Sequence, residues 1–342
     1  TAGGESGHVA NGEFFTQAVR SIVDTLESVT EEGHVFRVDL RLRPEGRSGA
    51  LIQSVAGYRH YFADRAELWE RQALIKARAC AGDEAVAARF FEAVRPFVYR
   101  LGLDPAIVRA VREMKAQIDR SLRGKDASHR NVKLGRGGIR EVEFLIQAMQ
   151  LLYGGDDPWL RERNSLRAIF RLTERGYLSH ALGRELGDAL VYLRTVEHRL
   201  QLLHEFQTHT LPEEPRALGL LARRMGVAQA PAAAARRFMI EHRRVTALVH
   251  RAFREFFAAP LGLTVHRQRL RLGGHAVRRS LAVEHHVGRP VADHELAQHR
   301  AWLQRAQVRV QAAQAQRRVD VFRVQRCQDD VVCRAGVRHR AP

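Results

Sequence analysis

A short run of alternating charged and apolar residues could hold a phosphate and its metal ion. Between residues 35 and 44, Arg37, Asp39, Arg41 and Arg43 alternate with apolar residues. Side chains two residues apart on a strand point the same way, about 6.5–7 Å from one another. Nucleotidyl transfer needs a carboxylate for Mg²⁺ and cations for the phosphate oxygens. The run fits a metal ligand at Asp39 flanked by phosphate-binding arginines, and it also fits a solvated strand face with ordinary Asp–Arg pairs.

A basic, glycine-rich loop is a second place where a phosphate could bind. It contains Lys133 and Arg136 and runs into a helix that begins near Ile139 and carries Arg140. Glycines let backbone N–H groups approach an anion, and a helix N-terminus adds partial positive charge. The pattern is neither a Walker A motif nor a dinucleotide-binding GxGxxG motif. A flexible link whose glycines only satisfy turn geometry is the alternative.

Other polar residues carry weaker signals. Residues 68–78, which read LWERQALIKAR, are typical of an ordinary amphipathic helix. The histidines at positions 198, 204, 209 and 242 lie among arginines without metal-ligand spacing, so we interpret them as surface or satisfied interior groups of a bundle. Cys80, Cys327 and Cys333 form neither a disulfide framework nor a zinc-binding pattern, which fits a reducing cytoplasm.

The alternating run must be positioned by a mixture of helix and strand. Residues 11–29 have apolar side chains at helical spacing. Residues 35–42 have the period of a strand, residues 44–46 supply a turn, and residues 50–54 can return as a partner strand. A single helix is then expected from Tyr58 to about Ala79, ending at Gly82.

Beyond this point every strong signal is helical. Asp104 and Pro105 suit the start of a helix that runs to about Leu122. Apolar seams over residues 139–153, 182–203 and 238–256 predict three helices of one bundle. We therefore expect an α+β fold that is predominantly α overall, with part of an α/β domain in residues 1–100 and a helical bundle in residues 101–262.

The net charge of +18 is concentrated at one end of the chain. Residues 263–342 contain 16 Arg and no Lys against 6 acidic residues, and their apolar residues follow no helical or strand period. We interpret this atypical tail as the product of a shifted reading frame or as a disordered basic arm. The charge therefore gives little support to specific nucleic-acid binding, and no stretch is apolar enough to span a membrane.

Several phrases of the sequence together resemble one enzyme family, the glutamine synthetase adenylyltransferase/adenylyl-removases. The matching phrases are residues 11–15, residues 36–44 with Gly46, Ser48 and Gly49, residues 69–78 and residues 132–147. The resemblance covers residues 1 to about 262. The wording of residues 133–144, with Arg140 before Glu141, is similar to the deadenylylating half rather than to the adenylylating half.

The resemblance implies a fold and an activity. Residues 1–100 would be the C-terminal part of a truncated, palm-type nucleotidyltransferase domain. The activity implied is phosphorolysis, in which inorganic phosphate releases AMP from a tyrosine of glutamine synthetase as ADP, in the presence of Mg²⁺. Asp39 matches the third metal-binding carboxylate of this fold. Phosphate or nucleotide binding is expected at Arg37, Arg41, Arg43, Ser48, Lys133, Arg136 and Arg140.

The sequence departs from the family pattern in one respect. The family's Asp-x-Asp pair is absent from this sequence, so we expect a fragment that is inactive by itself. The implied partners are glutamine synthetase and the P-II signalling protein, ATP or ADP would be substrate or product, and the location would be cytoplasmic. Two alternatives stay open: the half that attaches AMP from ATP, and a basic helical protein that binds nucleic acid.

Overall fold

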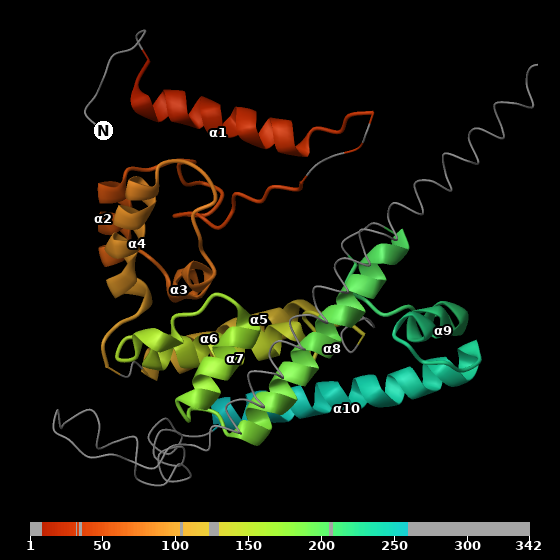
Figure 1. The fold of residues 1–342 in the computed structure, drawn as a ribbon. Coiled ribbons are helices and arrows are strands. Elements are labelled where there is room, and N and C mark those ends of the chain that lie inside the picture. Colours follow the sequence, from red (N-terminus) through yellow and green to blue (C-terminus); the bar gives the residue numbers. More distant parts are fainter. Residues whose placement is uncertain are drawn as a thin grey trace, which may run out of the picture. The chain divides into compact units, whose positions relative to one another are not determined.

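The described part of the chain is almost entirely helical. The computed structural model describes residues 9–31, 33, 36–102, 105–122, 130–204 and 208–258 (Figure 1). The chain divides into two compact units, residues 1–103 with 151–156, and residues 104–150 with 157–342. The Arg-rich tail expected at residues 263–342 lies outside the described residues.

Packed aromatic rings form the core of the first unit. This unit contains α1 (Asn11–Glu27), α2 (Val55–Asp64), α3 (Leu68–Ile75) and α4 (Glu84–Val98). The rings of Phe62 in α2 and Phe97 in α4 stack with their centroids 4.9 Å apart. Tyr58 meets Phe90 edge to face at 5.0 Å. Aromatic pairs of this geometry stabilise a core beyond the area that they bury, so the α2–α4 pair anchors this unit.

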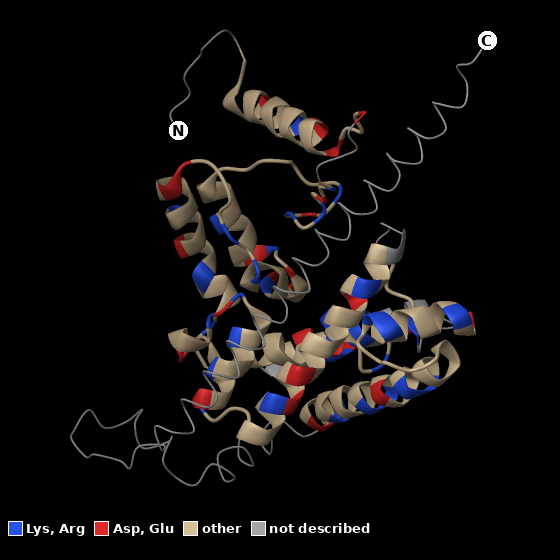
Figure 2. Ribbon diagram, turned by 45° about the vertical axis from the view of Figure 1, so that its right-hand side comes forward, with Lys and Arg blue, Asp and Glu red and all other residues tan. Residues whose placement is uncertain are grey.

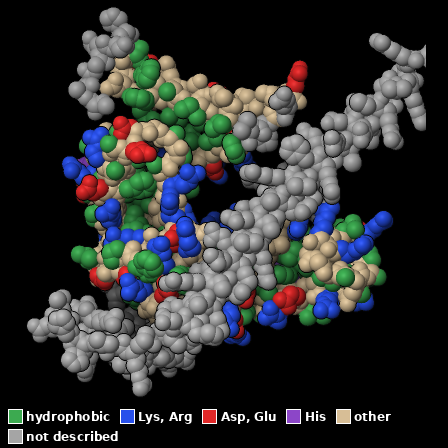
Figure 3. Space-filling model, viewed as in Figure 1, with side chains coloured by type: hydrophobic (Ala, Val, Ile, Leu, Met, Phe, Trp, Pro, Cys, Tyr) green, Lys and Arg blue, Asp and Glu red, His purple; other side chains and the backbone are tan. Residues whose placement is uncertain are grey.

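The predicted first helix forms, but its apolar face stays exposed. α1 has no buried residue, and Phe14, Phe15 and Ile22 are 58, 48 and 58% exposed. Apolar side chains are visible on the surface of this helix in the space-filling view (Figure 3). An amphipathic helix of a folded domain normally buries this face. Among the described residues, no apolar surface covers the apolar face of α1.

The strands expected over residues 35–42 and 50–54 do not form in the described part of these segments. Residues 36–40 have no regular secondary structure, and the described residues contain only two isolated bridges, Thr30 with Gly33 and Asn131 with Thr210. The N–H of Val38 donates to the side chain of Glu27 rather than to a neighbouring strand. A strand is completed by the hydrogen bonds of a partner, and alternation in one segment does not supply that partner. The expectation of a predominantly helical chain is confirmed, whereas the described residues show no strand of the expected α/β part.

The single helix expected from Tyr58 to Ala79 is two helices, α2 and α3. The side chain of Glu67 accepts the N–H of Glu70, and Glu70 Oε1 accepts the N–H of Glu67 at 3.0 Å. This reciprocal capping box starts a new helix. The apolar spacing concealed it, because the spacing continues across the break.

The second unit is a bundle arranged around α6. Its elements are α5 (Pro105–Leu122), α6 (Ile139–Tyr153) as far as residue 150, the 3-10 turn η2 (Pro158–Leu160), α7 (Ser165–Glu174), α8 (His180–His204), α9 (Pro215–Arg224) and α10 (Pro231–Ala258). The predicted helix from Pro105 to Leu122 is confirmed by α5. Acidic and basic residues are interspersed along these helices (Figure 2).

The three predicted apolar seams are buried in α6, α8 and α10. Residues from all three helices are at most 8% exposed, among them Val142, Ile146, Met149, Leu186, Leu193, Val196, Leu200, Phe238, Val245, Val249 and Phe256. Burial of each such side chain stabilises the fold by about 1.5–3 kcal/mol before entropy is subtracted. Within the described residues, no helix is both long and apolar enough to cross a membrane.

Candidate functional site

Asp39 and Arg41 form a local ion pair at the surface of the first unit. Arg41 Nε lies 2.9 and 3.0 Å from the two carboxylate oxygens of Asp39, and Arg41 Nη2 lies 2.5 Å from Oδ2. Both side chains are about half exposed. These side-chain hydrogen bonds hold the pKa of Asp39 below its usual range. A hydrogen bond from the backbone N–H of Arg41 and the positive charge of Arg37 act in the same direction. Asp39 is therefore a carboxylate, as a metal ligand must be, but its oxygens are shared with Arg41.

Arg43 and Ser48 shape the turn that follows Asp39. The guanidinium of Arg43 donates to the carbonyl oxygens of Leu40, Arg47 and Gly49 at 2.6, 3.1 and 3.0 Å. Ser48 Oγ donates to the carbonyl oxygen of Glu45. Arg43 thus has its donors directed into its own turn rather than toward a phosphate.

The residues present do not complete a magnesium site. Mg²⁺ in phosphoryl-transfer enzymes is held by carboxylates together with the substrate's phosphate oxygens. In the described part of the chain, no group of three His, Cys, Asp or Glu residues could hold a metal ion. Asp39 is one carboxylate among arginines, so further ligands would have to come from outside the described residues.

The helix α3 proves to be more than an amphipathic surface helix. Arg71 is fully buried and donates to the carbonyl oxygen of Val98 at 3.2 and 3.3 Å. Glu70 is 5% exposed and accepts a 2.8 Å hydrogen bond from the hydroxyl of Tyr61. Gln72 is also 5% exposed, and its side-chain amide has no hydrogen-bond partner among the described residues. The polar residues of this helix therefore tie it into the first unit.

The glycine-rich loop of the second unit is folded onto itself by hydrogen bonds. Asn131 Oδ1 accepts the N–H groups of Lys133 and Leu134 at 3.1 and 2.7 Å. The N–H groups of Ile139 and Arg140 at the start of α6 donate to the carbonyl oxygens of residues 132 and 133, both at 3.0 Å. These donors are used within the protein. An anion at this loop would therefore meet mainly side chains rather than a cradle of N–H groups.

The loop's glycines allow close packing. Gly137 has φ +70°, and a Cβ built on it would lie 1.9 Å from the carbonyl oxygen of Thr246 in α10. A Cβ on Gly138 would lie 2.7 Å from the carbonyl oxygen of Val132. At position 137, only glycine can both adopt this positive φ and fit the space beside Thr246. The loop is a packed connection rather than a flexible link.

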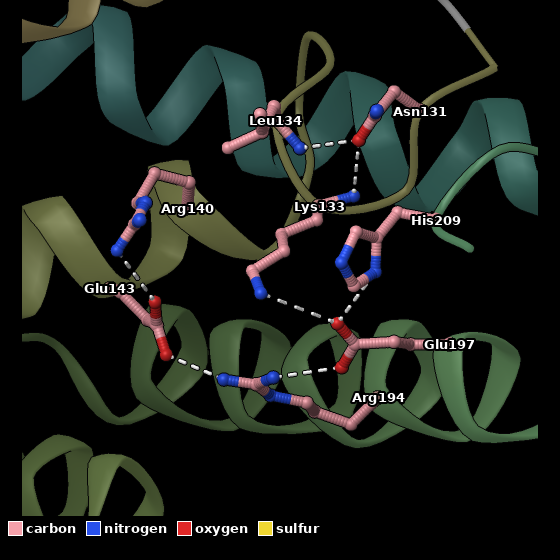
Figure 4. A network of polar contacts seen from close by, with 8 residues as sticks. All are labelled: Asn131, Lys133, Leu134, Arg140, Glu143, Arg194, Glu197 and His209. Carbon is pink, nitrogen blue, oxygen red and sulfur yellow. Dashed lines mark hydrogen bonds and ion pairs between the residues drawn. The ribbon is translucent and has the colours of Figure 1, made fainter. Parts of the chain in front are cut away.

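A chain of ion pairs joins this loop to α6 and α8 (Figure 4). Glu197 lies 4.0 Å from Lys133 Nζ and accepts a 2.8 Å hydrogen bond from Arg194. Another nitrogen of Arg194 donates to Glu143 at 2.6 Å, and Arg140 lies 3.8 Å from the second oxygen of Glu143. The charges alternate in the order Lys133, Glu197, Arg194, Glu143, Arg140. Both ends of the chain are cations.

Burial makes this chain different from a surface ion pair. The side chains of Glu197 and Glu143 are 4 and 12% exposed, whereas those of Lys133, Arg194 and Arg140 are 33, 33 and 38% exposed. Burial acts to lower the pKa of Arg194, but Glu143 and Glu197 outweigh it and the pKa is raised. Glu197 is thus buried, Glu143 is largely buried, and removing Arg194 would take the nearest cation from both carboxylates.

His209 joins the ion chain at Glu197, beside Lys133. Its Nδ1 lies 3.1 Å from Glu197 Oε1. Burial and the positive charge of Lys133 lower the pKa of His209, and Glu197 only partly opposes them. The imidazole is therefore neutral near pH 7. The carbonyl oxygen of His209 accepts the N–H of Val132 at 2.8 Å, which fastens residues 208–211 to the loop.

A second buried cluster lies on the other side of α6. Glu141, 1% exposed, lies 3.1 Å from both Lys115 Nζ of α5 and His250 Nδ1 of α10. Residues two apart on a helix face opposite sides. Glu141 therefore ties α6 to α5 and α10, while Glu143 ties it to α8.

The structure places the predicted phosphate-binding residues in different situations. Lys133 and Arg140 stand at the two ends of the ion chain, whereas Arg136 is an exposed residue of the loop. Sequence reasoning missed Arg194, Glu197 and Glu143. The Arg194–Glu197 spacing of three residues was a usable signal, but the bond from Arg194 to Glu143 spans 51 positions and has no local pattern.

Two family models match different parts of the chain. The family model described as glutamate-ammonia ligase adenylyltransferase matches residues 1–93, and that of the GlnD PII-uridylyltransferases matches residues 112–257.

Similar proteins from several bacteria share one name. A bifunctional glutamine synthetase adenylyltransferase/adenylyl-removing enzyme of Nitrosococcus oceani is 44% identical over 250 residues, which are 73% of this chain and 25% of that protein. Those of Pseudomonas putida and Pseudomonas aeruginosa are 46 and 44% identical over 59 and 60% of this chain, and the match covers 21% of each relative. The chain thus spans at most about a quarter of the length of these relatives. It belongs to the family of the bifunctional glutamine synthetase adenylyltransferase/adenylyl-removing enzymes.

Proposed function

We propose that this chain is a segment of the deadenylylating half of such an enzyme, which acts in the cytoplasm on adenylylated glutamine synthetase. The observation that carries the proposal is the identity of 44% over 250 residues to a relative named for both attachment and removal of AMP. The choice of half rests on the phrase at residues 133–144, where Arg140 and Glu141 stand in place of the acidic phrase of the adenylylating half. Attachment of AMP from ATP is the alternative.

The proposed reaction is phosphorolysis. An oxygen of inorganic phosphate attacks the phosphorus of the AMP–tyrosine diester, and the bond from phosphorus to the tyrosine oxygen breaks. The products are ADP and tyrosine, whose oxygen takes up a proton. Arg37 and Arg41 are the cations of this chain that would stabilise negative charge on the phosphates. Arg43 and Ser48 hold the turn that presents them.

Asp39 is the carboxylate that this chain would contribute to a complete Mg²⁺ site. Arg41 would have to release it, because their bidentate contact occupies both oxygens. Since the described residues hold no complete metal site and the chain spans about a quarter of its relatives, we expect activity only from a longer protein that contains it. P-II is the proposed regulatory partner of that longer protein.

The test measures ADP released by the intact protein that contains this segment, from adenylylated glutamine synthetase and inorganic phosphate. Asp39→Asn is expected to abolish release, whereas Asp64→Asn, an exposed carboxylate at the end of α2, should leave it unchanged. Near-normal release by Asp39→Asn at saturating Mg²⁺ would contradict the assignment of Asp39. Loss of AMP attachment with removal intact would favour the alternative half.

A further inference from the structure

The ion chain of the second unit carries an excess of positive charge. It contains three permanent cations and two carboxylates, and His209 is neutral near pH 7. Among the described residues, Glu197 is the carboxylate paired with Lys133 and Glu143 is the one paired with Arg140. Arg136, in the same loop, is exposed and adds further positive charge. The two carboxylates of the ion chain therefore do not neutralise its three cations.

The excess charge lies at the two ends. Arg194 makes short contacts of 2.8 and 2.6 Å with Glu197 and Glu143 through two of its nitrogens. Lys133 and Arg140 make contacts of 4.0 and 3.8 Å, which are longer than charge-assisted hydrogen bonds. These two end groups keep donors that a further acceptor could use.

The surroundings hold both end groups in place. Asn131 and nearby carbonyl oxygens fix the loop that contains Lys133. The backbone N–H of Lys133 is itself bonded to Asn131 Oδ1. Arg140 is in the first turn of α6, and its guanidinium lies over the ring of Phe144 at 5.4 Å. In Figure 4 Lys133 extends from the loop toward Glu197, and Arg140 extends from α6 toward Glu143. A site of this kind is preorganised, so binding would cost little ordering entropy.

We propose that Lys133, Arg140 and Arg194 form a binding site for a small dianion with the oxygen geometry of phosphate. Lys133 contributes a compact point charge, and Arg140 contributes a planar guanidinium that can hold two oxygens. Arg194 lies between the two carboxylates and supplies the central positive charge. The side chains bind the anion, because the N–H groups around the start of α6 are used.

The site does not depend on the proposed deadenylylation. All its residues belong to the second unit, and its test needs neither glutamine synthetase nor Mg²⁺. Inorganic phosphate and a dicarboxylate share the required chemistry, so both are tested. For inorganic phosphate we expect a dissociation constant on the order of 1 mM, as is reasonable for a solvent-accessible site with a few charged contacts.

The experiment titrates the chain with inorganic phosphate at constant ionic strength and follows ³¹P line broadening. Lys133→Met and Arg140→Leu should each weaken binding about tenfold, the loss expected for one charge-assisted contact. The matched control is Arg244→Leu, which removes the same charge from a surface pair with Glu241 in α10. Succinate in a parallel titration distinguishes a dicarboxylate from phosphate as the preferred ligand.

A second readout follows the ring of His209 by NMR. Lys133 holds the pKa of His209 down, so an anion that neutralises Lys133 should raise this pKa in the unchanged protein. In Lys133→Met the pKa should start higher and no longer respond to phosphate. Binding that is as tight in both site variants as in Arg244→Leu, together with a His209 pKa that ignores phosphate and succinate, would overturn the proposal.

Discussion

The charged groups of the two units follow opposite designs. In the first unit, Asp39 and Arg41 are two residues apart, about half exposed, and bonded to each other. In the second unit, Glu197 is buried and Glu143 is only 12% exposed, and they take their partners from a loop and two helices. An exposed pair contributes about 0–1 kcal/mol at most, whereas breaking a buried pair costs several. The first arrangement is free to exchange partners, and the second holds helices together.

Glu197→Gln should show the largest difference between the two designs. It takes the buried carboxylate away from Lys133 and leaves Arg194 with Glu143 alone, so we expect the free energy of unfolding to fall by roughly 3–5 kcal/mol. Urea unfolding of the chain measures this change. Asp39→Asn in the same chain is the control and should leave the unfolding midpoint where it was. Equal midpoints for both variants would show that the ion chain does not support the second unit.

His242 provides the next test, through pH. It is 3% exposed in α10, and its ring stacks on Phe238 with centroids 5.8 Å apart. Burial lowers its pKa from 6.5 to about 4. The unfolded chain therefore takes up a proton before the folded one does as the pH falls. Stability present above pH 6.5 should decline toward pH 4, by roughly 3 kcal/mol from this group.

The measurement is urea unfolding at a series of pH values between 7 and 4. His242→Phe should remove this part of the pH dependence, because phenylalanine does not titrate. The control is His60→Phe, which changes an exposed histidine beside Asp64 in the first unit and should leave the slope unchanged. A slope that survives in His242→Phe would contradict the assignment.

Much of the fold could be read from the sequence, and the reason is local. Residues 139–153, 182–203 and 238–256 have apolar side chains at helical spacing, and these faces are buried in the structure, whereas the helix at residues 105–122 was predicted from its start at Asp104 and Pro105. The break between α2 and α3 was missed because a capping box was concealed by continuous apolar spacing. The expected strand at residues 35–42 was wrong for the described chain because a strand also needs a partner, which alternation cannot guarantee.

The candidate site was predictable only in its local part. Asp39 with Arg41, and the basic loop with Lys133, follow from residue types within a few positions. The sequence could not show that Arg194 bridges Glu197 and Glu143, since that bridge depends on how α6 and α8 pack. Nor could it show that the loop's N–H groups are used internally, which moves any anion from the backbone to the side chains.

Two glycines with positive φ sharpen the comparison between a packed and an open segment. Gly137→Ala places a Cβ against the carbonyl oxygen of Thr246 at φ +70° and should cost roughly 1–3 kcal/mol. Gly46→Ala, at φ +59° in the first unit, meets nothing within 4 Å and should cost less, since only backbone strain remains. Thermal unfolding of both variants measures the difference. Equal losses would mean that the loop does not need its close approach to α10.

The smallest effect is expected at the Asp39–Arg41 pair, where charge matters for titration but hardly for folding. Arg41→Ala removes the bidentate hydrogen bond that holds the pKa of Asp39 down, so that pKa should rise toward its usual value while the remaining charge of Arg37 still opposes the rise. Because both side chains are about half exposed, the unfolding midpoint should not change measurably. NMR titration of the Asp39 carboxyl carbon measures the pKa. A pKa that stays low in Arg41→Ala would mean that other cations hold Asp39 ionised, and a lowered midpoint would mean that the pair belongs to the same structural class as the buried chain of the second unit.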